Sequence, residues 1–129
     1  MEKINFLYQS FKNIIGKNRY SYLIKYIKEY KCKNIIEVGV WNGENSKKML
    51  NAATLNQQSN DEINYWGFDL WEEMDDAIYQ KEYSKKPPKM HDVRRNLEST
   101  GCNINLIKGD TKITLKKFYN IAKKKIFPI

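Results

Sequence analysis

The sequence contains few residues of the kinds that bind metals or form disulfides. Its 129 residues include only two cysteines, Cys32 and Cys102, which show no metal-ligand spacing. We therefore expect no metal site and a reducing, cytoplasmic setting. The single histidine, His91, falls in a predicted helix, where we assign it to the surface or to packing rather than to a catalytic base. The catalytic residues stay unassigned from the sequence.

Long apolar runs are lacking as well. No run reaches the roughly 18 residues that a membrane-spanning helix needs. Residues 1–17 have neither an unbroken apolar core nor a small-residue cleavage site, so we expect no signal peptide. The turn that follows the first predicted strand lacks the G-K-[ST] of a P-loop and the G-x-G-x-x-G of a dinucleotide site. These absences argue against a membrane span and against both of these nucleotide-binding motifs.

Basic residues are what the sequence has in excess. Lys and Arg number 23 against 15 Asp and Glu, which gives a formal net charge of +8. Such a charge favours an anionic partner such as nucleic acid or a membrane surface. The lysines are scattered and no nucleic-acid motif accompanies them, so nucleic acid is the less favoured partner. With 41% hydrophobic and 29% charged residues, the chain is typical of one soluble globular domain with a modest core.

Helical and strand-like patterns alternate along the chain. Helices are indicated by apolar residues at intervals of three and four, and strands by short β-branched or aromatic runs. Gly16 and Gly101 are placed as helix stops. The expected helices cover residues 6–15, 20–30, 44–56, 72–83, 90–99 and 113–124, and the expected strands cover 34–40, 63–69 and 104–108.

This alternation predicts an α/β fold with a parallel sheet. We expect a Rossmann-like, three-layer αβα arrangement with a partial sheet of about three to four strands. Residues 1–30 would form an N-terminal helical segment, and residues 31–129 the partial domain. Ligands of such sheets bind outside the carboxyl ends of the strands. Here that edge carries residues 39–43, Asp69 and Asp110.

The first turn, in the stretch IIEVGVWNGENS (residues 35–46), is suited to a ligand. Gly39 lets the backbone approach a ligand closely, and Gly43 does the same where a helix begins and offers free N–H groups. Ser46 adds a hydroxyl. Glu37 inside the strand needs a partner, either backbone amides of the turn or a cation on a ligand, because a buried carboxylate is costly alone. The alternative is a plain strand-to-helix turn in which the glycines serve only geometry.

The ends of the next two strands carry one acid each. Asp69 suits the hydroxyls of a ribose, with Leu70 or Trp71 to cover an adenine; the alternative is a cap for the following helix. Asp110 suits an exocyclic amine such as that of adenine, while Asp110 or Thr111 could equally cap the last helix. Both alternatives stay open at this point.

Taken in order, these motifs resemble those of a known family. They are Glu37-x-Gly39-x-x-x-Gly43-x-x-Ser46, Asp69 after the strand 65–68, and Gly109-Asp110 after the third strand. Over residues 20–125 the chain resembles class I S-adenosylmethionine-dependent methyltransferases, and within them the branch of macrocin-type O-methyltransferases. The resemblance implies S-adenosylmethionine as the cofactor and a small-molecule substrate.

The resemblance also implies roles for single residues. Glu37, Gly39 and Gly43 would surround the methionine part of the cofactor, together with Val40, Trp41 and Ser46 of the same turn. Asp69 would hold the ribose hydroxyls and Leu70 would lie beside the adenine. Asp110 and Thr111 would meet the adenine edge.

The family's sheet has seven strands, and this chain ends at Ile129, about where the fourth is expected. We therefore expect the acceptor-side half to be missing and the strand 34–40 to be an uncovered edge. Three explanations compete: a truncated product, a homo-oligomer whose missing strands come from another chain, and a non-catalytic remnant.

The expected function is that of the cofactor-binding half of a methyltransferase, which methylates an oxygen of a small molecule or sugar when completed. One alternative is a non-catalytic cofactor-binding or protein-interaction module that uses the exposed sheet edge. The other is a nucleic-acid methyltransferase or binder, which only the charge favours.

Overall fold

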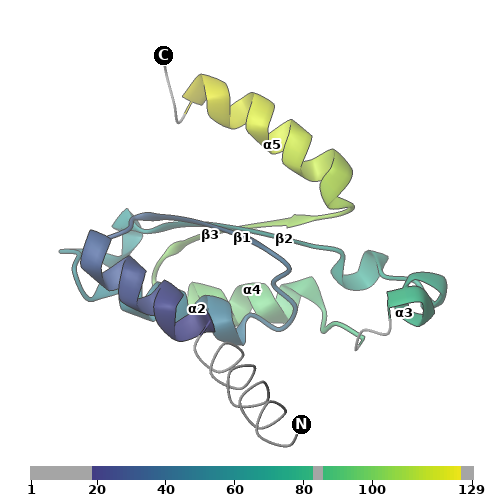
Figure 1. Cartoon of the computed structure of the whole chain (residues 1–129), viewed down its shortest axis with the longest axis horizontal. Coiled ribbons are helices and arrows are strands. Elements are labelled where there is room, and N and C mark those ends of the chain that lie inside the picture. The colour runs from purple at the N-terminus through teal and green to yellow at the C-terminus, as the bar shows by residue number, and fades with distance from the viewer. Residues whose placement is uncertain (1–18, 83–85, 126–129) are drawn as a thin grey trace, which may run out of the picture.

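The computed structural model of the chain describes residues 19–82 and 86–125. Within them, three parallel strands form one sheet in the order β1-β2-β3, with helices between the strands (Figure 1). The expected mixed α/β class with a parallel sheet is thus confirmed. The strands are β1 (Asn34–Val38), β2 (Asn64–Asp69) and β3 (Asn103–Lys108); the helices are α2 (Glu44–Thr54), α3 (Asp76–Glu82), α4 (Met90–Glu98) and α5 (Thr111–Lys125), with short 3-10 helices η1 (Asn60–Glu62) and η2 (Trp71–Glu73).

The register of the sheet aligns an asparagine at the start of each strand. Asn34 pairs with Asn64, and Asn64 pairs with Asn103. The Nδ2 of Asn64 donates to Oδ1 of Asn34 at 3.1 Å, and the Nδ2 of Asn103 donates to Oδ1 of Asn64 at 3.0 Å. This row of amides marks the amino ends of the strands, so their carboxyl ends meet at the opposite edge of the sheet.

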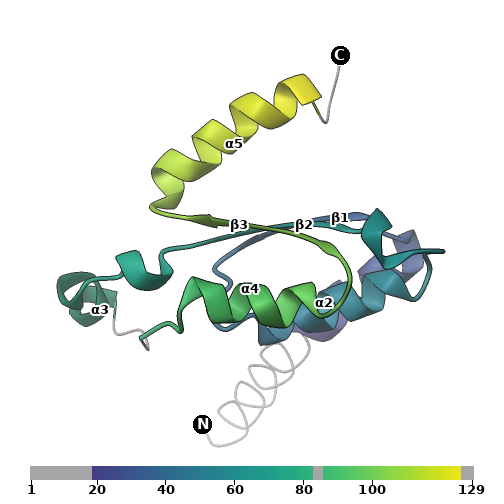
Figure 2. The same cartoon turned by 180° about the vertical axis from the view of Figure 1, so that it is seen from behind.

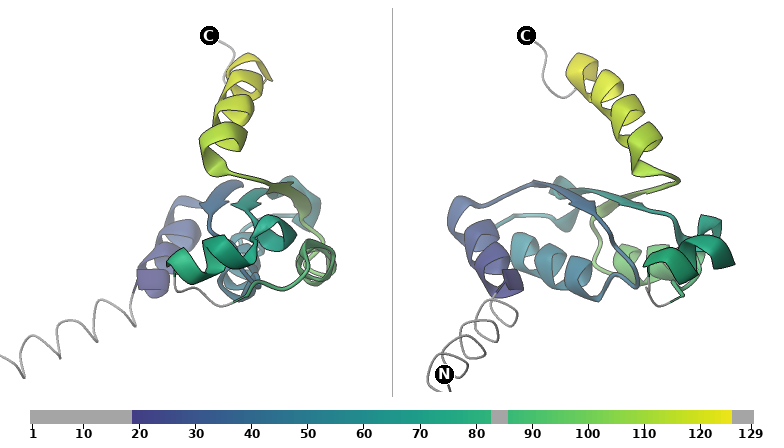
Figure 3. Two further views of the ribbon diagram at one scale, coloured as in Figure 1. Left: turned by 90° about the vertical axis from the view of Figure 1, so that its right-hand side faces the viewer. Right: turned by 45° about the vertical axis from the view of Figure 1, so that its right-hand side comes forward.

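The helices lie on both sides of the sheet. Figures 1 and 2 show α2 and α4 along one face and α5 on the other side, and both views of Figure 3 show α5 well apart from α2 and α4. On the α2 and α4 side, Leu50 and Leu97 are fully buried, and such burial stabilises a fold by roughly 1.5–3 kcal/mol for each side chain. On the α5 side, the ring of Phe118 packs edge-on against Phe68 at 5.4 Å between centroids.

The helix over residues 19–30 agrees with the prediction for residues 20–30, but its apolar side is only partly covered. Ile27 is buried, whereas Leu23 is 44% and Tyr30 63% exposed. The helical spacing therefore located the helix correctly, while among the described residues only part of its apolar face has a packing partner.

One predicted helix is wrong in form. The single helix expected over residues 72–83 is interrupted, because η2 ends at Glu73 and Met74 is extended before α3 begins. Trp71 adopts a left-handed backbone (φ 43°) and buries its side chain completely, so the chain turns there. A carboxylate oxygen of Asp75 then accepts from the N–H of Ile78 at 2.8 Å and starts α3 afresh.

The other element ends agree with the predictions to within about two residues, as element boundaries normally allow. The first strand stops at Val38 rather than at residue 40, because Gly39 takes a left-handed conformation (φ 87°). Gly101 ends the α4 segment with φ 80°, as expected of a helix-stop glycine. The helix predicted over residues 6–15 and the apolar segment 126–129 lie outside the described residues.

Candidate functional site

The two glycines of the turn after β1 have different surroundings. Both have positive φ, 87° at Gly39 and 78° at Gly43. A side-chain carbon built on Gly39 would have no atom within 4 Å, so the space beside it is open to a ligand. The same carbon on Gly43 would lie 3.1 Å from Val93 and 3.3 Å from Leu97, so Gly43 allows α4 to pack against the turn. Only Gly39 has the open approach that the sequence suggested for both.

Glu37, near the end of β1, is held by two hydroxyl groups. Its Oε2 accepts a hydrogen bond from Oγ of Ser46 at 2.5 Å and another from Oη of Tyr65 at 2.6 Å. The two hydroxyl oxygens are 3.0 Å apart. Ser46 belongs to α2 and is fully buried, and Tyr65 belongs to β2 and is fully buried. The partners of Glu37 are therefore side-chain hydroxyls from two neighbouring elements, and not the backbone amides of the turn that the sequence suggested.

Tyr65 reaches Glu37 because β2 has a glycine two residues further on. Glu37 pairs across the sheet with Gly67, and side chains two apart on a strand lie on one face. A side-chain carbon on Gly67 would lie 2.8 Å from Cε1 of Tyr65 and 2.8 Å from Cγ2 of Val40. The absence of that carbon lets the ring lie over residue 67. Neither Tyr65 nor Gly67 was predicted as a site residue; the signal in the sequence was Tyr-x-Gly in one strand beside an acid in the neighbouring strand.

Burial controls the protonation of this cluster. It raises the pKa of Glu37, the bonds from Ser46 and Tyr65 partly offset that rise, and the negative charge of Asp69 adds to it. Burial and the charge of Glu37 also raise the pKa of Tyr65 well above its ordinary value, so Tyr65 keeps its proton and remains a donor.

Asp69 ties the turn after β1 to the turn after β2. Its Oδ2 accepts from the N–H of Trp41 at 2.7 Å, and its Oδ1 accepts from the N–H of Leu70 at 2.7 Å. The indole N–H of Trp71 adds a bond to the carbonyl of Trp41 at 3.0 Å. Asp69 thus bridges two loops, and the helix cap considered as its alternative role is not what the structure has: η2 has no side-chain cap.

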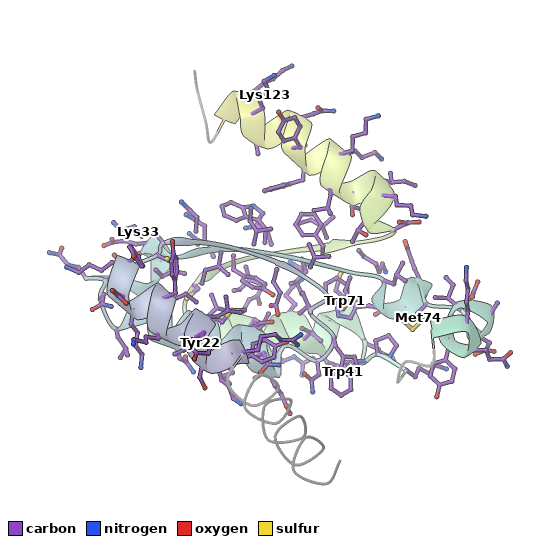
Figure 4. All side chains as sticks on the ribbon, viewed as in Figure 1. Tyr22, Lys33, Trp41, Trp71, Met74 and Lys123 are labelled. Carbon is purple, nitrogen blue, oxygen red and sulfur yellow. The ribbon has the colours of Figure 1, made fainter. Side chains whose placement is uncertain are left out.

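The residues considered as adenine covers differ in exposure. Trp71 is fully buried, so it has no face to offer a ligand, and Leu70 is half-buried. Trp41 is 42% exposed although its neighbour Val40 is buried. Figure 4 shows Trp41 and Trp71 at the same end of the sheet, with Met74 further toward α3. The exposed aromatic side chain at this edge is therefore that of Trp41.

Asp110 caps α5, which confirms the alternative weighed for it. Its Oδ1 accepts from the N–H of Lys112 at 2.9 Å, and Thr111 is the first residue of the helix. The preceding Gly109 donates its N–H to the carbonyl of Asp69 at 3.0 Å, so the turns after β2 and β3 are adjacent. Asp110 is exposed and Thr111 is half-buried. Because they follow Gly109, both lie near Asp69 at the carboxyl ends of the strands.

A groove of about 530 Å³ runs between the helix over residues 19–30 and the outer edge of β1, which no strand of the described residues covers. Glu37, Val38 and Gly39 lie at one end of its lining. The structure thus brings Glu37 and Gly39 together at the groove, with Ser46 and Tyr65 behind Glu37. Asp69 and Asp110 are on the same edge of the sheet but outside the groove lining. Among the described residues, the lining consists of Arg19, Tyr20, Leu23, Tyr26, Ile27, Cys32, Asn34, Ile35, Ile36, Glu37, Val38, Gly39 and Met49.

Within residues 19–82 and 86–125, no group of three or more His, Cys, Asp or Glu residues could hold a metal ion. No helix in that part of the chain is long and apolar enough to cross a membrane. Neither the models of known protein families nor the curated protein sequences gave a match to this chain.

Proposed function

We propose that the edge formed by the carboxyl ends of the strands binds S-adenosylmethionine. The observation that carries this proposal is the pair Glu37 and Gly39: an acid in the lining of the groove, two residues before a glycine with open space beside it. An acid can accept the ammonium group of the methionine part, and the glycine allows close approach of the ligand to the backbone. The amino end of α2 would favour the carboxylate of the same ligand.

The adenosine part would extend toward Asp69 and the turn after β3. Each oxygen of Asp69 accepts one backbone N–H, and an ionised carboxylate has about four acceptor positions. Capacity for ribose hydroxyls therefore remains. Leu70 and the exposed Trp41 supply apolar surface for an adenine, and Asp110 and Thr111 lie close by on the other side of Gly109.

The proposed reaction is methyl transfer to an oxygen of a small molecule or sugar. We place the acceptor on the β1 side of the sheet, where further strands, from outside the described residues or from another chain, would complete a Rossmann-like, three-layer fold. The presence of helices on both sides of the parallel sheet supports that architecture. Two free thiols, Cys32 and Cys102, support a cytoplasmic setting.

Calorimetric titration with S-adenosylhomocysteine tests the proposal. We expect binding by the wild-type chain and loss of binding in Asp69→Ala. The matched control is Asp92→Ala, which removes an exposed acid in α4 and should bind as the wild type does. Circular dichroism of each variant separates loss of the ligand from loss of the fold. Absence of heat with the folded wild-type chain would contradict the proposal.

A second candidate function, a protein-interaction module, is favoured by the free edge of β1. The N–H of Asn64 donates to the carbonyl of Lys33, and the N–H of Gly39 donates to the carbonyl of Phe68. The odd-numbered residues of β1 therefore direct their backbone groups to β2, and those of Asn34, Ile36 and Val38 point to the free edge. Ile36 is 54% and Val38 56% exposed. An apolar, uncharged edge of this kind invites another strand.

A second copy of the chain could supply that strand. Antiparallel pairing about a twofold axis through Ile36 would join Ile36 to its own copy and Asn34 to Val38 of the other chain. Sedimentation should then show a concentration-dependent dimer, and Ile36→Lys should remain monomeric. The control Ile113→Lys places the same charge on α5, where Ile113 is 57% exposed, and should not change the association. A monomeric wild-type chain at all concentrations would count against this candidate.

A further inference from the structure

We propose that Tyr65 and Ser46 are positioning residues: they hold one carboxylate oxygen of Glu37 so that the other faces the groove as the acceptor for a primary ammonium group. This inference rests on the proposed function and specifies how the amino-acid part of the ligand would be recognised. Tyr65 is fully buried in β2, so it would act on the ligand through Glu37 and not by direct contact.

The two oxygens of Glu37 have different surroundings. Both hydroxyl groups bond to the same oxygen, Oε2, at 2.5 and 2.6 Å. The other oxygen, Oε1, has no hydrogen-bond partner within the described residues. No side-chain oxygen there is both fully closed off from solvent and without a partner, so Oε1 is not completely buried. Since Glu37 lines the groove, its unbound oxygen is available to a ligand in the groove.

The groove favours a cation with N–H donors over a metal ion. Of the described residues that line it, only Glu37 is acidic, and a single carboxylate is too few ligands for Ca²⁺ or Mg²⁺. The other charged side chain of the lining is Arg19, which donates to the hydroxyl of Tyr20 at 3.3 Å. A primary ammonium offers three N–H donors and needs no fixed coordination geometry. A carboxylate with one free oxygen therefore matches it.

Positioning by Tyr65 is rigid because the ring is confined on several sides. Gly67 lies under the ring. A side-chain carbon on Gly67 would be 2.8 Å from the ring and also 2.8 Å from Cγ2 of Val40, so Val40 closes the same space. Ser46 approaches from α2, so Glu37 is held from two elements of the fold. A carboxylate held in place before binding loses less freedom when the ligand arrives, and this increases affinity.

The groups around Glu37 define how binding should respond to pH. Tyr65 and Asp69 face it from β2, Ser46 from α2, and Arg19 and Cys32 line the same groove. A carboxylate whose pKa is raised by burial takes up a proton at higher pH than an exposed one. Ammonium binding requires the ionised form, so it should weaken as the pH falls through that raised pKa.

The test compares two ligands that differ in the amino-acid part. S-adenosylhomocysteine carries the ammonium group, and 5′-methylthioadenosine lacks it. In calorimetric titrations, Tyr65→Phe and Ser46→Ala should each bind S-adenosylhomocysteine about tenfold more weakly, because each loses one charge-assisted hydrogen bond to Glu37. Their affinity for 5′-methylthioadenosine should be unchanged. The control Tyr22→Phe removes the hydroxyl of a 69%-exposed tyrosine and should alter neither affinity.

The possible outcomes separate this inference from the proposed function. Equal losses for both ligands would mean that the hydroxyls only support the fold, and would overturn the inference while leaving the cofactor proposal standing. No heat with either ligand and the wild-type chain would overturn both. The wild-type chain supplies an independent measurement if the variants do not fold. Its affinity for S-adenosylhomocysteine should fall at acid pH more than that for 5′-methylthioadenosine, and identical pH profiles would overturn the inference.

Discussion

Glu37 and Asp69 lie at the same edge of the sheet, yet the protein holds them in different ways. Both oxygens of Asp69 accept backbone N–H groups, from Trp41 and from Leu70. Glu37 is held by side-chain hydroxyls, and only through one of its oxygens. The carboxylate of Asp69 is therefore part of the loop structure itself. That of Glu37 is supported through one oxygen, while the other has no partner within the described residues, which is the arrangement expected of a group that meets a ligand.

The largest effect on stability should come from Asp69→Ala. The change leaves the N–H groups of Trp41 and Leu70 without the carboxylate that links the two turns. Since bonds to a charged group contribute about 1.5–3 kcal/mol each, we expect the free energy of unfolding to fall by about 3 kcal/mol. Urea denaturation measures it. The control Asp92→Ala should change it by less than about 0.5 kcal/mol. A similarly small loss in Asp69→Ala would remove the contrast with Glu37.

Gly67→Ala should have a smaller but clear effect. The added methyl group would lie 2.8 Å from both Tyr65 and Val40, which is too close for atoms that do not move. Overpacking of this kind typically costs about 1–3 kcal/mol, so we expect a loss of about 2 kcal/mol in urea denaturation. The loss should be smaller in a Tyr65→Leu background, where the ring is gone. If the two backgrounds show the same loss, Gly67 is not there to accommodate the ring.

The smallest effect should be the pH dependence that Glu37 contributes. Burial raises its pKa in the folded chain above the ordinary value of 4.5. Between that value and the folded pKa, the folded chain keeps a proton that the unfolded chain has released. The unfolding free energy of the wild type relative to Glu37→Gln should therefore be highest below pH 4.5 and fall as the pH rises through this window.

Urea denaturation of both chains, between about pH 4 and pH 8, measures this difference. Glu37→Gln serves as the reference because it keeps the shape of the side chain and removes its titration. A difference that grows with rising pH would show that the folded chain favours the ionised carboxylate, and would contradict the cause assigned to burial.

Much of the local structure followed from short-range patterns. The strand around Ile35, the helix around Ile27 and the glycine stop at Gly101 were all predicted, because they depend on residues close in the sequence. The helix predicted over residues 72–83 was wrong at its start, because the α-helix begins only at Asp76, after the turn at Trp71. The left-handed backbone of Trp71 accompanies complete burial of its indole, and neighbouring residues do not show that burial.

The sequence singled out some residues of the candidate site but not their contacts. Glu37, Gly39 and Asp69 were singled out because acids and glycines at strand ends suit a ligand. Glycines at residues 39 and 43 looked alike in the sequence, yet only Gly39 has open space beside it. Gly43 instead contacts α4, which lies about 50 residues further along the chain and comes near only through folding. The resemblance to methyltransferases stays a prediction.

The sequence by itself determined the order of strands and helices, the parallel sheet and the acids at its carboxyl edge. These depend on periodicity and on turn-forming residues, which act over a few positions. Only the tertiary structure decided that Gly67 of β2 pairs with Glu37 of β1 and that Tyr65 reaches Glu37 over this glycine. Those contacts join segments nearly 30 residues apart, and they depend on strand register, because a shift of one residue would turn Tyr65 to the opposite face of the sheet.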